Sequence, residues 1–295
     1  MKTLVGLAGA GAGVAAYASL IERTWFALRT ERVPVLPQGH PPIKILHLSD
    51  THLMPGQKKK IAWVRQLAEW SPDLVIATGD FISSPKSLPD LSRMFEPFWG
   101  VPGFFVFGSN DFFEPIPVNP LRYLKSRSTV TRRPTLPTGA LKTLFEEGGW
   151  VDLEERRFET TVAGTTIEFR GCGDAHINRA HYEMVAGQPD SSADLAIGVT
   201  HSPYLRVLDA MTDDGLDLIV AGHTHGGQVC LPGYGALVTN CDLDRGRVKG
   251  LHHHRVGLKR SFLQVSAGLG TSPYAPYRFC CRPEASLLML VPRDS

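Results

Sequence analysis

The sequence lacks the cysteine pattern of a disulfide-stabilised or zinc-ribbon protein. Its 295 residues include only five cysteines, and two of them, Cys280 and Cys281, are adjacent. The number is odd, the chain is long, and no two cysteines have the CxxC spacing of a structural zinc site. We therefore expect reduced and partly buried thiols, which favours a reducing compartment.

The sequence also lacks a strong charge of either sign. Its 31 Lys and Arg against 29 Asp and Glu give a net charge of +2, which is too small to indicate a nucleic-acid partner. Arg127, Arg132 and Arg133 in segment 115–138 are too few to form the basic groove of a nuclease. No internal repeat or low-complexity tract is present. We expect a folded protein that does not bind nucleic acid.

Residues 1–32 hold a long run without charge. No charged residue occurs from Thr3 to Ile21, which is about the length needed to cross a bilayer. The run is rich in Gly and Ala and poor in Leu, Ile and Val, so a membrane anchor, a cleaved signal peptide and a packed helix all remain open. We favour the anchor. Three arginines follow the run, and the positive-inside tendency then favours a cytoplasmic main domain. They are Arg23, Arg29 and Arg32.

Residues 43–291 are predicted to form one α/β domain after a proline-rich linker or edge strand at 33–42. Apolar strands and amphipathic helices alternate in the first half, at 43–48, 61–70, 73–78, 88–98 and 104–107. This alternation predicts βαβ units and a largely parallel sheet. The second half holds a hairpin at 158–170 and strands at 195–199 and 216–220. We expect two sheets packed face to face with helices outside. Residues 115–138 are predicted to be an insertion loop.

Polar residues follow these predicted strands at the point where each strand stops. They are Asp50, His52, Asp80, Ser109, Asn110, Asp111, His201, His223 and His225. Because the carboxyl ends of parallel strands converge on one crevice, we expect these side chains to meet. Carboxylates with neutral imidazoles are ligands for divalent Mn, Fe or Zn. Asp80 could bridge two ions about 3.5–4 Å apart, which would clamp an attacking hydroxide and a phosphoryl oxygen.

The ordered motifs resemble those of the calcineurin-like metallophosphoesterase family. They are Asp50-Thr51-His52, Gly79-Asp80, Gly108-Ser109-Asn110-Asp111, Thr200-His201-Ser202-Pro203 and Gly222-His223-Thr224-His225-Gly226-Gly227. The continuation Gln228-Val229, with Leu231-Pro232, looks like a bacterial membrane-associated branch, some members of which cut pyrophosphate or diester bonds in lipid precursors. The resemblance covers residues 43–291 and implies a four-layer α/β/β/α sandwich of two mixed sheets. An N-terminal hydrophobic helix would precede it.

The resemblance also implies a role for each motif residue. Asp50, His52 and His225 would hold the first of two metal ions. Asp80 would bridge the ions, and His201 and His223 would hold the second with one further ligand. A metal-bridging hydroxide would then attack phosphorus in line. The residues implied in catalysis are Asp50, Asp80, Asn110 and His201.

The third motif departs from the family pattern. That pattern is Gly-Asn-His followed by Asp or Glu, in which the Asn binds metal and the His assists the leaving group. Strict register places Ser109 in the metal position, whereas a local shift would let Asn110 reach the metal. We favour Asn110 because an amide oxygen is a better ligand than a neutral hydroxyl. In both cases the histidine is absent, so another residue protonates the leaving group or the leaving group needs little help.

Three further polar groups are open to a structural reading. Asp174 and His176 would either face the site or form a turn, and residues 252–254, all histidines, are predicted to lie in a solvated loop. Residues 58–60, all lysines, are predicted to be a solvated helix face, with contact to anionic lipid headgroups as the alternative.

We predict a dimetal phosphoesterase that hydrolyses a phosphodiester or pyrophosphate bond. Its substrate would be lipid-linked or nucleotide-like, and residues 1–32 would associate with the membrane. The alternative is a membrane-associated, metal-containing binding protein with little catalysis. The altered third motif favours this alternative, and the complete set of Asp and His ligands argues against it.

Overall fold

The computed structural model describes residues 9, 11–117 and 135–293 and contains two six-stranded sheets. The first sheet has the order β1 (Ala27–Leu36), β14 (Glu284–Pro292), β2 (Ile43–Leu48), β3 (Leu74–Thr78), β4 (Gly103–Val106) and β5 (Val151–Asp152). The second has the order β12 (Gly250–Val256), β13 (Lys259–Val265), β9 (Leu218–Ala221), β8 (Leu195–Thr200), β7 (Thr165–Cys172) and β6 (Arg156–Val162). Both sheets combine parallel and antiparallel pairs and are therefore mixed.

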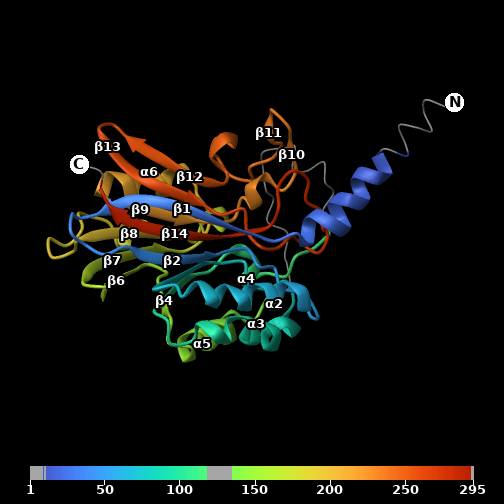
Figure 1. The fold of residues 1–295 in the computed structure, drawn as a ribbon, viewed down its shortest axis with the longest axis horizontal. Coiled ribbons are helices and arrows are strands. Elements are labelled where there is room, and N and C mark those ends of the chain that lie inside the picture. Colours follow the sequence, from blue (N-terminus) through green and yellow to red (C-terminus); the bar gives the residue numbers. More distant parts are fainter. Residues whose placement is uncertain (1–8, 10, 118–134, 294–295) are drawn as a thin grey trace.

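Helices cover the outer faces of both sheets (Figure 1). The first sheet is covered by α2 (Lys58–Gln66), α3 (Leu88–Phe95) and α5 (Thr138–Glu147), and the second by α6 (Leu205–Asp214). The predicted four-layer α/β/β/α sandwich is confirmed. α2 and α3 continue into short 3-10 turns, so the predicted helices 61–70 and 88–98 correspond to α2 with Leu67–Trp70 and to α3 with Glu96–Phe98.

The central strands form where the sequence has continuous apolar runs. β2, β3 and β4 are parallel neighbours in the sheet, and β2 also pairs with β14. Almost every residue in these three strands is buried. Strands buried on both faces need apolar side chains in both directions, which explains why these segments do not alternate. The predicted strand at 43–48 coincides with β2, and those near 74 and 104 are shifted by one residue.

The first sheet begins earlier in the chain than the sequence indicates. β1 starts at Ala27 and is an edge strand that runs parallel to β14, with Val33, Val35 and Leu36 buried. The division into an N-terminal segment 1–32 and a domain 43–291 stays a prediction. The pairing of β1 leads us to move the start of the domain to residue 27 or before.

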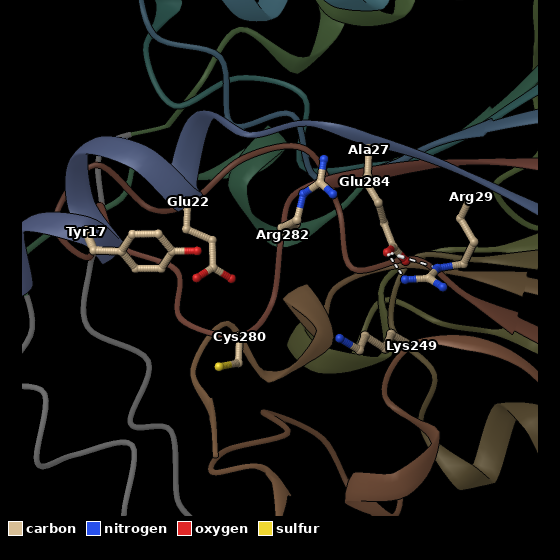
Figure 2. A pocket seen from close by; sticks show the side chains of 8 residues that line it. All are labelled: Tyr17, Glu22, Ala27, Arg29, Lys249, Cys280, Arg282 and Glu284. Atoms are coloured by element: carbon tan, nitrogen blue, oxygen red, sulfur yellow. Dashed lines mark hydrogen bonds and ion pairs between the residues drawn. The ribbon is translucent and has the colours of Figure 1, made fainter. Parts of the chain in front are cut away.

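A short helical segment at residues 11–21 leads into β1 and closes in a π-helical turn, η1 (Tyr17–Ile21). Tyr17 and the buried Glu22 face Cys280 and Arg282 across a cavity of about 350 Å³ (Figure 2). Within the described part of the chain, no helix has both the length and the apolar character needed to span a bilayer. Most of the first ten residues of the predicted anchor lie outside the described residues.

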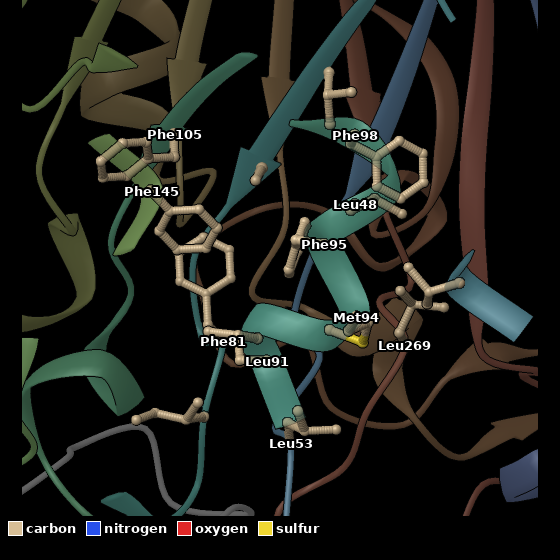
Figure 3. Packing of buried hydrophobic residues seen from close by; sticks show 14 of the residues in the cluster. Leu48, Leu53, Phe81, Leu91, Met94, Phe95, Phe98, Phe105, Phe145 and Leu269 are labelled. Atoms are coloured by element: carbon tan, nitrogen blue, oxygen red, sulfur yellow. The ribbon is translucent and has the colours of Figure 1, made fainter. Parts of the chain in front are cut away.

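An aromatic cluster between the first sheet and its helices holds the loop that follows β3 (Figure 3). The ring of Phe81 is fully buried and lies 4.6 Å, between centroids, from that of Phe145, with Phe95 at 6.3 Å. Phe81 directly follows Asp80. Truncation of such a buried ring costs about 3–5 kcal/mol, so this packing fixes the backbone that carries Asp80.

Two predictions about basic residues are wrong in part. His252, His253 and His254 lie in strand β12 rather than in a loop, and His254 is buried with its Nε2 2.7 Å from Asp209 Oδ1. Of the three lysines at 58–60, Lys58 and Lys59 are exposed as predicted, whereas Lys60 is buried and its Nζ donates to the carbonyl of Thr51 at 2.6 Å. Burial lowers the pKa of Lys60 to about 7.

Of the predicted insertion 115–138, residues 118–134 lie outside the described part.

Candidate metal centre

The predicted ligands gather at one edge of the two sheets, directly after strands β2, β3, β4, β8 and β9. Five of the seven adopt a positive φ, between 39° and 68°, which non-glycine residues rarely do. They are Asp50, His52, Asp80, His223 and His225. Each such residue costs of order 1–3 kcal/mol, and residues of this kind cluster at functional sites. The left-handed turns bend the chain back so that side chains from different strands face one another.

Asp50, His52, Asp80 and His225 bring four ligand atoms within 4.8 Å of one another. The Nε2 of His52 lies 3.3 Å from Asp80 Oδ2 and 3.2 Å from His225 Nε2. The Nε2 of His225 lies 3.6 Å from Asp50 Oδ1. Two imidazole nitrogens and two carboxylates that converge on one point form a suitable donor set for a divalent transition metal.

A second group shares Asp80 with the first. The Nε2 of His201 lies 3.6 Å from Asp80 Oδ1, and the Nδ1 of His223 lies 3.3 Å from the same His201 nitrogen. Asp80 therefore turns Oδ2 towards the first group and Oδ1 towards the second. This is the arrangement that a carboxylate bridging two ions requires.

Asn110 contacts Asp80 from α4 (Ser109–Phe112). Its backbone N–H donates to Asp80 Oδ1 at 2.7 Å, and its amide Nδ2 donates to Asp80 Oδ2 at 2.7 Å. Because an amide presents oxygen instead of nitrogen after a 180° rotation, the same side chain can offer Oδ1 to a cation. Ser109 is buried behind it, with its hydroxyl 3.4 Å from Asn110 Nδ2.

Two glycines leave room for this arrangement. A Cβ at Gly108 would lie 2.3 Å from Asp80 Oδ1 and 2.6 Å from the ring of His201. A Cβ at Gly79, whose φ is +79°, would lie 2.8 Å from His201 Nδ1. Any side chain at either position would displace a proposed ligand.

Asp111 holds the loops of the second and third motifs together. Its carboxylate accepts backbone N–H groups from Asp80 and Phe81, both at 2.7 Å, and from Gly108 at 2.9 Å. Three backbone donors on one carboxyl group tie the residues after β3 to those after β4. This acidic residue of the third motif is therefore structural, and it lies outside the proposed ligand set.

The electrostatics of the site suit a cation. Burial lowers the pKa of His225 well below its ordinary value and that of His223 to about 3, so both rings are neutral, as metal ligands must be. Burial also lowers the pKa of His201, but the carboxylates of Asp80, Asp174 and Asp50 outweigh this effect and raise it to about 9. The carboxylates thus favour a proton on His201 when no metal is bound. A divalent cation bound there would balance the same negative charge.

Most ligand histidines have a partner for the second ring nitrogen, which fixes the ring orientation. His201 Nδ1 lies 2.5 Å from the carbonyl of Thr78, and His52 Nδ1 lies 3.1 Å from Ser83 Oγ. His223 Nε2 lies 3.1 Å from the carbonyl of Asn240. These partners lie far from their histidines in the sequence, and no motif signals them.

Arg278 lies beside the fourth histidine, and its position also has no signal in the sequence. It is fully buried, and its Nη2 lies 3.4 Å from His225 Nδ1. The same atom donates to the carbonyls of Ala267 and Gly270, both at 2.7 Å. The guanidinium thereby ties the loop after β13 to the turn that carries His225.

His176 both forms a turn and lies beside the site. Asp174 Oδ1 accepts the backbone N–H of His176 at 2.9 Å and the hydroxyl of Ser202 at 2.5 Å. The ring of His176 lies 4.6 Å from that of His223, between centroids, and its Nδ1 lies 2.9 Å from the hydroxyl of Tyr204. The sequence left open whether Asp174 and His176 form a turn or face the site, and the structure is compatible with both.

Comparison with known proteins agrees with this geometry. The sequence model of the calcineurin-like phosphoesterase family matches residues 43–227. The Bacillus subtilis protein YpbG is 27% identical over 89% of this chain and 87% of its own length. The B. subtilis metallophosphoesterase YkuE is 26% identical over 96% and 91%, and the Escherichia coli phosphodiesterase YaeI is 28% identical over 93% and 92%.

Proposed function

This chain belongs to the calcineurin-like phosphoesterase family, and we propose that it hydrolyses a phosphodiester or pyrophosphate bond with two divalent metal ions. The observation that carries the proposal is the convergence of Asp50, His52, Asp80 and His225 within 4.8 Å. That the chain is a metal-dependent phosphoesterase acting on a phosphate ester follows from the family. The roles of single residues, the metals and the kind of ester are what we propose here.

Asp50, His52 and His225 would hold one ion, His201, His223 and Asn110 the other, and Asp80 both. When bound, such a pair supplies a water of lowered pKa and stabilises charge on phosphoryl oxygens. The protein's own part is to hold the neutral imidazoles in place, through Thr78, Ser83 and Asn240, and to keep Asp80 oriented through the backbone N–H of Asn110. Two carboxylates, four imidazoles and an amide suit Mn, Fe or Zn, and we propose one of these metals.

The kind of ester is inferred from the third motif. An amide cannot serve as a general acid near neutral pH, so Asn110 cannot protonate a departing alkoxide. A bond whose leaving group is already a stable anion, such as the phosphate of a pyrophosphate, suits this site better than an alkyl monoester. A lipid-linked or nucleotide-like pyrophosphate or diester meets this condition, and a lipid-linked one agrees with membrane association through the N-terminal segment.

A second candidate function is a metal-containing binding protein with little catalysis. The specific observation in its favour is that Asn110 stands where the family has a histidine. The paired carboxylates and the full set of four histidines argue against it, because a site that has lost its chemistry is expected to have lost ligands more widely.

The test is metal analysis of the purified chain together with turnover on a panel of monoesters, diesters and pyrophosphates. We expect two metals per chain and preferential turnover of diesters or pyrophosphates. Two bound metals with no turnover on any of the panel would favour the binding protein. A chain that binds no divalent metal would contradict both functions.

A further inference from the structure

Large hydrophobic side chains are exposed mainly at one end of the molecule. Eleven such residues are more than 40% exposed in the described part of the chain, and eight of them lie in three segments. The N-terminal segment has Val14, Leu20, Ile21 and Trp25, the β10–β11 hairpin has Leu231, Tyr234 and Leu237, and the loop after β13 has Tyr274. Single exposed apolar residues are ordinary, but a concentration of this kind marks an interaction site.

The three segments lie side by side. The hairpin consists of β10 (Cys230–Leu231) and β11 (Gly235–Ala236), and Cys230 donates its N–H to the carbonyl of Phe279 at 2.8 Å. Phe279 in turn contacts Tyr17 edge to face, and Arg278 donates its backbone N–H to the carbonyl of Ala18 at 3.0 Å. In Figure 1 the N-terminal helix projects from the end of the molecule where this hairpin also lies.

Basic side chains accompany the exposed aromatic ones. The guanidinium of Arg282 lies 4.2 Å over the ring of Trp25, and that of Arg245 lies 4.1 Å over the ring of Tyr234. The cavity between η1 and the loop after β13 is lined by Arg29, Lys249 and Arg282 (Figure 2). Glu284 pairs with Arg29 at 3.0 Å, whereas no carboxylate of the described residues pairs with Lys249. Aromatic rings beside cations suit the headgroup region of an anionic membrane.

The same surface borders the metal centre. The hairpin follows the turn that carries His225 by a few residues. After the hairpin, Asn240 places its carbonyl 3.1 Å from Nε2 of His223. A surface that docks here would therefore lie next to the two metal positions. An enzyme whose substrate is held in a membrane needs the membrane surface next to its metal centre, and this surface meets that need.

We propose that the β10–β11 hairpin and Tyr274, together with Leu20, Ile21 and Trp25, form a contact surface for an anionic lipid bilayer. The uncharged run from Thr3 to Ile21 leads into this surface and favours a bilayer over a second copy of the chain. The hairpin is thus a second membrane-contact element, separate from the N-terminal segment. The benefit for catalysis rests on the proposed function, but the contact itself does not.

The test is co-sedimentation of the full chain with phosphatidylcholine vesicles, with and without phosphatidylglycerol. The variant is the double substitution Leu231→Ser and Tyr234→Ser. The control is Leu258→Ser, because Leu258 is fully exposed in the turn before β13, at the opposite end of the second sheet from the metal centre. The two substitutions remove apolar side chains that the bilayer would bury, so we expect the partition coefficient to fall at least about tenfold in the double variant. We expect no change in Leu258→Ser.

Further variants guard against misfolding of the hairpin. Tyr274→Ser should weaken vesicle binding and leaves the hairpin unchanged. Tyr234→Trp should retain vesicle binding, because tyrosine and tryptophan rings both suit the membrane interface. Unaltered binding in the double variant and in Tyr274→Ser would overturn the proposal. The proposal would also be overturned if the wild type were a dimer without vesicles and the double variant a monomer, as measured by sedimentation, because the surface would then bind a second copy of the chain. Turnover of a soluble aryl diester by the wild type is measured separately, so that a failure of the proposed function is distinguishable from a failure of the membrane contact.

Discussion

The Nε2 of His47 lies 2.8 Å from the hydroxyl of Thr78, and this contact starts a buried hydrogen-bonded chain that ends on the proposed ligand Asp50. Thr78 Oγ1 donates to Ser49 Oγ at 2.7 Å, and Ser49 Oγ donates to Asp50 Oδ2 at 2.6 Å. Burial lowers the pKa of His47 to about 3, so its ring is neutral and donates through Nε2. These three hydrogen bonds fix the orientation of the Asp50 carboxylate.

Loss of this support should weaken metal binding. Partners that orient metal ligands are typically worth about 10–100-fold in metal affinity. We expect Ser49→Ala to lower metal affinity by about that factor and His47→Leu to lower it less, because His47 acts through two hydroxyls. The measurement is a competition titration with a chelator of known affinity. Thermal unfolding in excess chelator separates an effect on metal from one on stability, and equal metal affinity in both variants and the wild type would exclude the orienting role.

Metal binding should release a proton. The neighbouring carboxylates hold the pKa of His201 at about 9 against the effect of burial, so its ring is protonated below that pH when no metal is bound. Because a metal binds only the neutral ring, affinity should rise by up to about tenfold per pH unit between neutral pH and about pH 9 and then level off. Titration calorimetry in buffers of different ionisation enthalpy measures the released proton. His201→Gln should remove the dependence on buffer, and a wild type without such dependence would contradict the prediction.

The bridging position of Asp80 makes a sharper prediction for Asp80→Ala. Since both metal groups share this carboxylate, we expect the variant to lose at least one of two metals and turnover to fall by at least about 10³-fold. The matched control is Asp90→Ala, which removes an aspartate that bonds Gly56 and Arg93 away from the site. Elemental analysis and turnover of an aryl diester give the two readouts. Two retained metals with near-normal turnover would show that no carboxylate bridge exists.

The sequence predicts the parts of this protein in which local pattern and tertiary environment agree. The run 43–48 forms β2 because both of its faces are buried, and the predicted ligands meet because they follow strands whose ends converge. It offers an edge strand only as one alternative at 33–42 and misses residues 27–32 of β1, because the charges of Arg29, Glu31 and Arg32 conceal the start of an edge strand whose outer face is solvated.

Other features depend on contacts that no local pattern encodes. Lys60 belongs to a run of three lysines and is buried only because the carbonyl of Thr51 lies within its reach. The buried guanidinium of Arg278 is satisfied by carbonyls of loops that are remote from any motif. The positive φ angles of the ligands likewise follow from the three-dimensional positions of the strands rather than from residue type.

The position of β1 changes what is expected of N-terminal truncation. Removal of residues 1–16 should leave a folded protein, because the buried Glu22, Phe26 and all of β1 remain. Removal of residues 1–32 should destabilise it, since the loss of the Phe26 ring alone costs about 3–5 kcal/mol and six of the nine β1–β14 residue pairs are lost. Thermal unfolding and gel filtration compare the two deletions. If the longer deletion melted like the full chain, β1 would be dispensable and the domain would start near residue 43.

Asn110 makes a prediction about leaving groups. General-acid help typically contributes about 10²–10⁴-fold, and alkoxide leaving groups need it most. Asn110 cannot provide it, so we expect turnover to depend steeply on the pKa of the leaving group and to favour aryl oxides and phosphate over alkoxides. Asn110→His places an acid in the position where the family has one. Its rates on alkyl diesters should rise relative to those on aryl diesters, provided that metal content is kept.

His176 is the side chain that could invalidate this reasoning. Its ring lies 4.6 Å from that of His223, and the hydroxyl of Tyr204 lies 2.9 Å from its Nδ1, so a proton could reach the site from there. The test is a series of aryl and alkyl phosphodiesters of graded leaving-group pKa, run on the wild type, Asn110→His and His176→Ala. We expect a steep dependence in the wild type, an unchanged slope in His176→Ala and a flatter one in Asn110→His. A flat response in the wild type that becomes steep only in His176→Ala would instead identify His176 as the acid, because only the loss of a proton donor restores dependence on the leaving group.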